Sequence, residues 1–442
     1  MPTFRVHVRT WRDCMQGHPC RRTPGMRARS LIVALAATAA CSAWAAEPNP
    51  YYIGVTQSVA YDSNVFRVPE STVLPASANR SDASAATGLV GGFDQNIGRQ
   101  RFFGAAKLNL NRYQHNSSLN YTGYGANAGW DWATIEKLSG GFSVDVNQTL
   151  ANQDNLSTTQ PTTARDIVRT EQFATRARWG ADGLISLDGA YSHSRVNYSE
   201  NVNAGSTQDS GSLGGTYRAG PKLRLGAGVR LSRSEQAKGI QSAPGVYTAN
   251  RTNGRNLDLS ADWRPIVQST VNARVSWTNQ NNTGLTDRDF SGLTGALSAS
   301  LAPTAKLSFT TSLSREAGTN ASFFNLASAV PGQTISGLSE NSQTTNSLSL
   351  GASYAATAKI SLNAGLQYRS SKLVDQFTAG GAVITANQTD RTRSASLGGN
   401  YAIARNWSLG CNLAHMARDV SGRTSYDYSA NTASCSAQFV LR

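Results

Sequence analysis

The chain has 442 residues and a formal net charge of +14, yet only 15% of its residues are charged. Residues 1–45 hold seven arginines and one aspartate, which is +6 of that total. No basic run or nucleic-acid-binding motif remains beyond them, so the charge argues against a nucleic-acid-binding protein. A composition rich in Gly, Ser, Thr and Asn is typical of disorder, but the regular alternation described below argues against that interpretation.

The segment 1–45 has the three parts of a secretion signal. Arg27 and Arg29 precede a short apolar run, and Ala43-Trp44-Ala45 places small residues where a signal peptidase cleaves. The apolar run is too short for a membrane-spanning helix, which needs about 20 residues. We therefore expect a cleaved signal peptide over 1–45, starting at Met1 or at Met26, and an exported mature protein over 46–442.

Beyond the leader, apolar and polar residues alternate. Every odd-numbered residue from Leu223 to Leu231 is apolar, whereas the even-numbered residues between them are Arg or Gly. Successive side chains of a strand point to opposite faces, so the pattern predicts a strand with one apolar and one polar face. It recurs in 142–147, 257–263, 307–313 and 360–369. The polar face carries Ser, Gly and Asn rather than Lys and Glu, which argues against a soluble sandwich.

Aromatic residues end alternate strands, next to short turns. Aromatic side chains favour the membrane–water boundary, so these residues predict a periplasmic girdle. Longer polar connections lie between the short turns, and this asymmetry is typical of outer-membrane barrels. The predicted girdle is Trp132, Trp179, Tyr217, Trp263, Tyr354, Tyr401 and Phe439, and the long connections are 63–86, 151–165, 237–252, 318–340 and 372–388.

These patterns predict an all-β fold: a single transmembrane, antiparallel, up-and-down β-barrel. An open sheet would leave backbone groups unpaired in hydrocarbon, so the first strand must pair with the last. About 18 strands are expected, with 16 as the alternative, and an even number puts both mature termini in the periplasm. The predicted strands are 51–62, 87–98, 101–115, 120–134, 138–150, 166–179, 184–198, 207–218, 222–236, 253–264, 269–280, 287–301, 305–317, 341–355, 359–371, 389–402, 407–417 and 425–441.

Two of the five cysteines lie outside the leader. Cys411 and Cys435 are equally far from the predicted tip of the last hairpin, near Arg423, and both have the parity of lipid-facing residues. They are predicted to form a cross-strand disulfide if the pair geometry suits the bond; two free apolar cysteines are the alternative. Cys41, in the leader, is a weak lipidation candidate, because Thr38 replaces the usual leucine.

Nine charged residues have the parity of the polar face and are predicted to line the lumen. Rings of charge can set what passes through a pore, although any water-filled interior is lined with polar residues. At this strand number the interior should be wide enough for an aqueous channel. The nine are Lys107, Asp145, Asp188, Arg224, Arg230, Asp258, Asp262, Arg274 and Arg369.

Five short segments carry a resemblance to a known family: Tyr51-Tyr52-Ile53-Gly54-Val55, Tyr61-Asp62-Ser63-Asn64-Val65-Phe66-Arg67, Gly98-Arg99-Gln100-Arg101, Trp130-Asp131-Trp132-Ala133 and Leu138-Ser139-Gly140-Gly141. Together they resemble the EpsL-like outer-membrane barrels of exopolysaccharide gene clusters, which are associated with the exosortase B and PEP-CTERM system of Gram-negative bacteria. The resemblance covers most of 50–442. It implies a role in exopolysaccharide biosynthesis or export, and it brings no catalytic residues.

A catalytic function is not expected. Three histidines remain outside the leader, His115, His193 and His415, and none has a spacing that specifies an oriented nucleophile. No metal or phosphate-binding motif is present, so no cofactor is predicted. The prediction is a non-catalytic pore or scaffold whose partners are outer-membrane lipids, extracellular polysaccharide and periplasmic export components. A general diffusion porin, a surface adhesion barrel and an outer-membrane hydrolase are the alternatives.

Overall fold

The computed structural model describes residues 49–151, 163–180, 183–200, 205–243, 246–283, 289–318, 326–327, 334–335, 342–379, 382–421 and 426–442. The predicted signal peptide lies outside them. Eighteen strands form one antiparallel sheet, as predicted, joined alternately by short turns and longer connections. The strands are β1 Tyr51–Asp62, β2 Asp82–Ile97, β3 Gln100–Tyr113, β4 Tyr121–Ala133, β5 Leu138–Leu150, β6 Ile167–Trp179, β7 Ile185–Tyr198, β8 Ser206–Arg218, β9 Leu223–Ala243, β10 Val246–Trp263, β11 Ser269–Asn282, β12 Phe290–Leu301, β13 Leu307–Ala317, β16 Ser342–Ala355, β17 Ile360–Ala379, β18 Ala382–Ala404, β19 Trp407–Ser421 and β20 Tyr428–Leu441.

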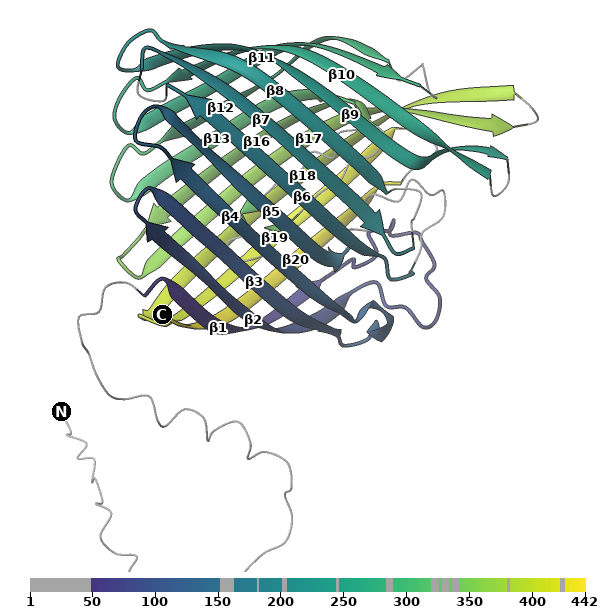
Figure 1. The fold of residues 1–442 in the computed structure, drawn as a ribbon. Helices are drawn as coiled ribbons and strands as arrows, with labels where there is room; N and C mark the ends of the chain where they lie inside the picture. Colours follow the sequence, from purple (N-terminus) through teal and green to yellow (C-terminus); the bar gives the residue numbers. More distant parts are fainter. Residues whose placement is uncertain are drawn as a thin grey trace, which may run out of the picture. The chain divides into compact units, whose positions relative to one another are not determined.

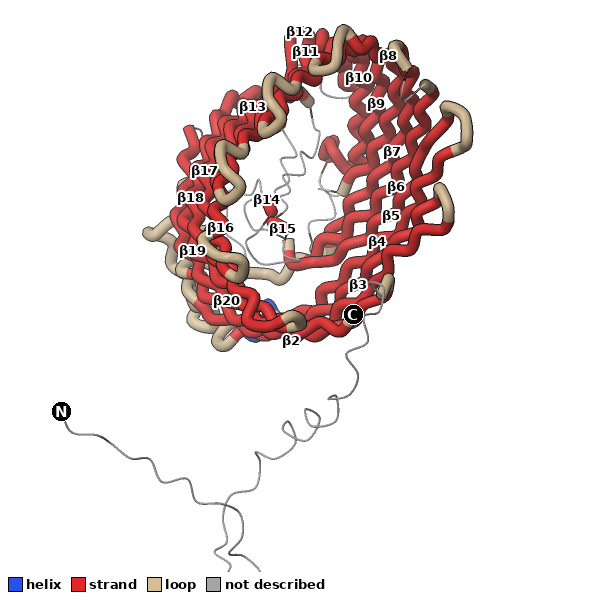
Figure 2. The backbone as a smooth tube through the Cα atoms, turned by 90° about the vertical axis from the view of Figure 1, so that its left-hand side faces the viewer, coloured by secondary structure: helices blue, strands red, loops and turns tan. Residues whose placement is uncertain are grey.

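The sheet closes on itself (Figures 1 and 2). β1 pairs with β2 on one side and with β20 on the other, where Ile53 lies opposite Leu441. β1 therefore begins, and β20 ends, at the end of the barrel that carries the short turns. Closure leaves no sheet edge without a hydrogen-bonded neighbour, which is the condition for crossing a hydrocarbon layer with strands.

Two predicted connections are wrong. β9 and β10 continue as a paired hairpin to Ala243 and Val246, inside the predicted loop 237–252. β17 and β18 likewise pair as far as Ala379 and Ala382, inside 372–388. A hairpin that extends beyond a membrane is stabilised by backbone pairing with water on both faces. Such a hairpin needs no apolar face, and alternation therefore cannot reveal it.

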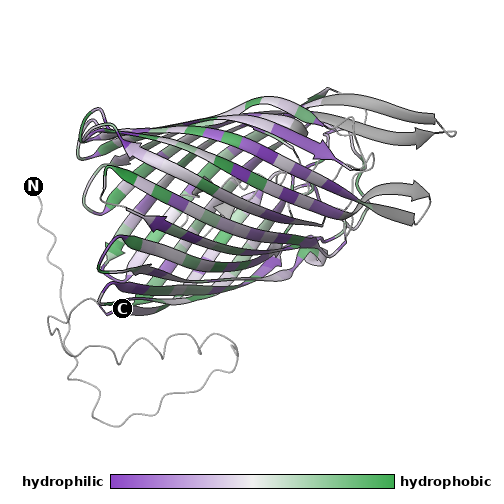
Figure 3. Ribbon diagram, turned by 45° about the horizontal axis from the view of Figure 1, so that its top comes forward, coloured by the Kyte–Doolittle hydropathy of each residue, from purple (hydrophilic) through white to green (hydrophobic). Residues whose placement is uncertain are grey.

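Hydrophobic and hydrophilic residues alternate along the strands (Figure 3). The apolar side chains are well exposed: Leu231 is 59% and Leu257 is 56% exposed. The polar side chains between them converge, so that Ser276 and Thr278 are buried. Side chains spread apart on the convex face of a barrel and crowd on the concave face. The apolar face is therefore the outer one, and the fold is that of a transmembrane barrel.

The predicted girdle residues all lie within three residues of the short-turn ends of their strands. Trp179, Tyr217 and Trp263 are 50%, 48% and 47% exposed. Trp407 and Phe439 lie opposite each other, with ring centroids 4.9 Å apart. Aromatic rings thus edge the apolar face at this end, as expected where hydrocarbon gives way to head groups.

At the other end, the connection after β1 folds over the seam between the first and last strands. Phe66 and Val68 are fully buried and pack with Leu119 of the short helix η1, Ser117–Leu119. The Asn64 amide donates hydrogen bonds to the carbonyl oxygens of Val68 (2.8 Å) and Ser429 (3.0 Å). Residues 61–67, one of the segments that carry the resemblance, therefore link β1 to β20 at this end of the barrel.

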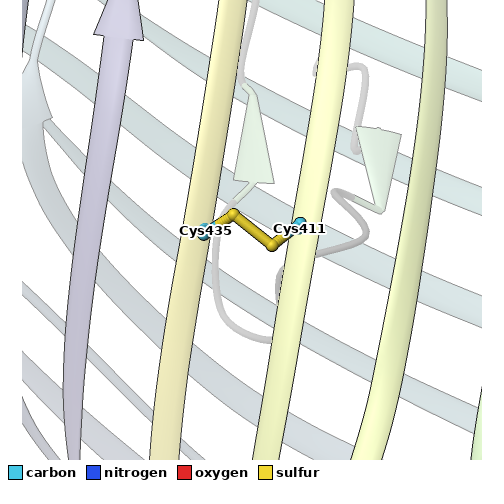
Figure 4. The surroundings of a disulfide bond; sticks show 2 residues. All are labelled: Cys411 and Cys435. Atoms are coloured by element: carbon cyan, nitrogen blue, oxygen red, sulfur yellow. A yellow bond between two sulfur atoms is a disulfide. The ribbon is translucent and has the colours of Figure 1, made fainter.

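Cys411 and Cys435 lie opposite each other on β19 and β20 and are joined by a disulfide (Figure 4), as the strand parity predicts. Their neighbours Leu409 and Leu413 are exposed on the apolar face. A separate two-stranded sheet, β14 Leu326–Ala327 and β15 Thr334–Ile335, lies within the ring of strands in Figure 2. Among the described residues, no helix has the length and hydrophobicity to span a membrane.

Candidate functional site: the charged inner wall

A chain of ion pairs crosses the inner wall near the short turns of β2 to β6. Arg101 binds Asp94 with two hydrogen bonds of 2.8 and 2.6 Å, and its guanidinium lies 3.7 Å from the carboxylate of Asp131. Arg176 donates to the same Asp131 carboxylate at 3.0 Å. Two residues along β6 from Arg176, Arg178 pairs with Asp188 of β7. Charges of alternating sign therefore follow one another around the wall.

A second group lies on β9 to β13. Arg230 donates two hydrogen bonds to Asp258, of 3.1 and 3.2 Å. Arg274 donates to Glu316 at 2.7 Å, although β11 and β13 are separated by β12. The pair forms across the intervening strand, where inward side chains crowd together. These four side chains are about one fifth to one third exposed, so water reaches them.

A groove of about 770 Å³ joins the two groups. Its lining includes Asp131, Arg178 and Asp188 from the first group and Asp258 and Arg274 from the second. The strands between them have small inward residues, and Gly214 lies directly opposite Gly228. A Cβ atom on Gly228 would come within 3.0 Å of the Gly214 Cα. Because these glycines have no side chains, the space on the inner side of the wall is not filled, and the groove stays open.

The structure places all nine predicted lumen residues on strands, with the parity of the concave face. Asp188, Arg230, Asp258 and Arg274 form the ion pairs above, and Asp262 lines the groove. Of the other four, Lys107 and Asp145 interact electrostatically, Arg224 lies opposite Asp262, and Arg369 donates to the Ser371 hydroxyl at 3.2 Å.

The prediction omitted several residues of this wall. Arg176 and Arg178 alternate with Ala177 and the exposed Trp179, so their parity assigns them to the concave face. Glu316 continues the alternation that begins at Leu307. The signal was therefore present in the sequence for each of them. Asp94, Arg101 and Asp131 belong to the same group and were omitted as well.

Toward the longer connections, the concave face of β10, β11 and β12 is neutral and closely packed. The Thr278 hydroxyl donates to the side-chain Oδ1 of Asn256 at 2.6 Å and shares a hydrogen bond of 2.7 Å with the Thr294 hydroxyl. Thr252 donates to Asn282 at 2.6 Å. All five side chains are buried. This part of the wall, called the neutral ladder below, is held by hydrogen bonds between uncharged groups and is shielded from water.

The charges of the inner wall nearly balance: the lining of the groove has three arginines and four aspartates. Among the described residues, each ion pair of the two groups joins an arginine to a carboxylate, and together these pairs hold five arginines and five acids. A wall of this kind binds water and polar groups of either sign, and it presents no strong field to exclude one sign of ion. The five arginines are Arg101, Arg176, Arg178, Arg230 and Arg274, and the five acids are Asp94, Asp131, Asp188, Asp258 and Glu316.

No protein-family model and no curated protein sequence matches the chain. Among solved structures, OpdO of Pseudomonas aeruginosa is 14% identical with a TM-score of 0.46, over 89% of this chain and 98% of that one. OpdQ of the same organism is 12% identical with a TM-score of 0.43 over the same shares. The siderophore receptor PirA of Acinetobacter baumannii is 7% identical with a TM-score of 0.43, over 89% and 81%. Similarities at this level assign no solute and no partner.

Proposed function

We propose that this protein is a non-catalytic pore of the bacterial outer membrane that passes polar solutes, with both mature termini in the periplasm. The observation that carries the proposal is the water-accessible groove on the inner wall of a closed barrel, whose charges nearly balance. A barrel of 18 strands is large enough to enclose an aqueous channel. Short turns face the periplasm in barrels of this kind, which sets the direction.

The solute class that we propose is an extracellular polysaccharide, and the pathway is its biosynthesis or export. Support comes from the resemblance of segments such as 61–67 and 130–133 to EpsL-like barrels. The nearly balanced groove is compatible with a neutral or weakly charged polymer, because hydroxyl groups of a sugar accept from arginine and donate to carboxylate. Outer-membrane lipids and periplasmic export components would be the partners.

Two experiments test the two parts separately. The purified mature protein should conduct ions in planar bilayers, and a barrel that stays closed at every voltage and salt concentration would contradict the pore. Deletion of the gene in its own host should reduce secreted polysaccharide, with complementation as the control. Unchanged polysaccharide in the deletion strain, together with normal conductance, would support the pore and contradict the role in polysaccharide biosynthesis or export.

A general diffusion porin is the second candidate, favoured by the same near balance of charge. It predicts permeability to small neutral solutes of many kinds. Liposome swelling with a series of mono-, di- and trisaccharides distinguishes the two. A steady fall of rate with solute size supports general diffusion, whereas retention of one saccharide class over others of equal size supports a dedicated pathway.

A further inference from the structure

The apolar outer face ends abruptly on successive strands. On β10 the outward residues run from Trp263 at the short turn through Leu257, and Arg255 follows. At about 3.4 Å per residue, the eight steps from Trp263 to Arg255 span roughly 27 Å along the strand. At the usual barrel tilt this is about 20 Å of membrane depth, comparable to the apolar band of such barrels, about 25 Å. Arg255 therefore lies at the depth of the outer-leaflet head groups.

Among the charged side chains that point outward at and beyond this boundary, most are arginine. Among the described residues, nine outward arginines stand there against four outward carboxylates. The excess of positive charge is on the lipid-facing side of the wall, separate from the nearly balanced groove inside. The arginines are Arg112, Arg169, Arg195, Arg233, Arg251, Arg255, Arg315, Arg391 and Arg393, and the acids are Glu171, Asp209, Glu235 and Asp419.

Three of these arginines converge at one place. Arg233 on β9 lies directly opposite Asn253 on β10, and Arg251 and Arg255 lie two positions to either side of Asn253. Diagonal neighbours on one face of a sheet are about 7–8 Å apart, within reach of side chains as long as arginine. The three guanidinium groups can therefore approach a common ligand.

Two carboxylates oppose these three cations: Asp209 of β8, which lies directly opposite Arg233, and Glu235. Glu235 accepts from Arg251 at 2.9 Å and lies 3.8 Å from Arg233. No carboxylate among the described residues is within ion-pair distance of Arg255. Arg233 and Arg251 remain half exposed. The cluster thus keeps a positive excess, and its donors are open to a ligand from outside.

The surface next to the cluster, toward the short turns, is apolar. Leu231 lies opposite Arg255, and Leu257 lies opposite Trp277 on the next strand. The three apolar side chains are 56–59% exposed on the convex face. A ligand that joins an anionic head group to hydrocarbon chains fits both parts at once.

We propose that Arg233, Arg251 and Arg255, with Asn253, bind the phosphorylated sugar head group of an outer-leaflet glycolipid, whose acyl chains lie along Leu231, Leu257 and Trp277. Each guanidinium group can donate two parallel hydrogen bonds to one phosphate group. A cluster of arginines is therefore better suited to bind a phosphate than to bind a diffuse anionic surface. Binding here anchors and orients the barrel in the outer leaflet. The site is independent of the pore, because the arginines and the groove residues point to opposite faces of the same strands.

The test uses full-length mature protein in detergent micelles with fluorescent diphosphorylated lipid A as the probe, and the dephosphorylated glycolipid as its partner. Wild type should bind the phosphorylated form at least about tenfold more tightly. The triple variant Arg233→Gln, Arg251→Gln, Arg255→Gln should lose that preference. A matched variant at the short turns, Arg264→Gln, Lys359→Gln, Arg405→Gln, removes as many cations at the other rim and should keep it.

Two further measurements make the outcome decisive. Unheated samples should keep the compact electrophoretic mobility of a folded barrel, and bilayer conductance should equal that of wild type for both variants. Equal binding of the two glycolipids by wild type, or retained preference in the β9–β10 variant, overturns the proposal. Displacement of the lipid by millimolar inorganic phosphate or by an acidic peptide alone would assign the cluster to a soluble anion, and would overturn it as well.

Discussion

The charged groove and the neutral ladder are built on the same strands and differ in what surrounds them. β10 carries Asp258 in the groove and Asn256 in the ladder, and β11 carries Arg274 and Thr278. In the groove, small residues leave room for water, and charged side chains stay partly exposed. In the ladder the inward side chains are in contact, and only uncharged groups are present. Burial of a charge costs far more than burial of a hydroxyl or amide that is hydrogen-bonded.

We expect the ladder to affect the stability of the barrel and the groove to affect its ion selectivity. Each hydrogen bond of the ladder is shielded from water, so removal of one partner leaves the other unsatisfied. Each ion pair of the groove is screened by water and salt, and contributes little to folding. Substitutions in the ladder should change the stability of the barrel, and substitutions in the groove should change which ions pass.

The largest effect is expected from Thr278→Val. Valine has nearly the shape of threonine but cannot hydrogen-bond, so Asn256 and Thr294 lose their shared partner. Loss of two buried hydrogen bonds should lower the free energy of unfolding by about 2 kcal/mol, measured by urea titration in lipid vesicles.

The control for this change is Thr311→Val, because Thr311 lies on the convex face between the exposed Phe309 and Leu313. Its free energy of unfolding should be unchanged or slightly higher. If both variants lose the same stability, the contrast between the two faces is not supported. Ion selectivity should be unchanged in either variant.

The next effect is expected from Ser212→Trp, which places an indole in the groove. Single-channel conductance should fall, since the indole is a large side chain that would fill part of the groove. Leu213→Trp, one residue along, points to the convex face, where Leu213 is 65% exposed, and should leave conductance unaltered. A larger loss for the Leu213 variant would reverse the assignment of inner and outer faces.

A smaller effect is expected from Arg274→Gln, which removes a cation and leaves Glu316 without its partner. The groove then has an excess negative charge, and the ratio of cation to anion permeability should rise about twofold at low salt. Reversal potentials in a tenfold KCl gradient measure this ratio. Glu316→Gln should shift the ratio in the opposite direction, and identical shifts for the two variants would contradict the pairing.

The smallest effect is expected from Arg101→Gln. The Arg101 and Asp94 side chains are about half exposed, so solvent already screens the pair. A cation preference should be measurable at 10 mM salt, where the Debye length is about 30 Å, and should disappear at 1 M, where it is about 3 Å. A preference that persists at 1 M would mean that this pair lies in a dry constriction and not in an open groove.

The sequence carried enough information for the strands, their faces and the cross-strand cysteine pair, since alternation records which side of each residue meets apolar surroundings. The same parity assigned Arg230 and Asp258 to one face, and it would have assigned Arg176 and Glu316 had it been applied to every strand. Parity contains no information on depth along the strand or on the partner of a charge. Which carboxylate each arginine binds could not be predicted for that reason.

The residue pattern by itself determined an all-β barrel of about 18 strands, with short turns at one end and a disulfide across the last hairpin. Only the tertiary structure decided that β9–β10 and β17–β18 extend as hairpins beyond the apolar band. Strands with water on both faces need no alternation of apolar and polar residues, so the sequence does not reveal them. The tertiary structure also decided that Arg274 reaches Glu316 across β12, and that Arg233, Arg251 and Arg255 surround one asparagine. Those contacts depend on register and on crowding inside a closed wall, which appear only when all strands are paired.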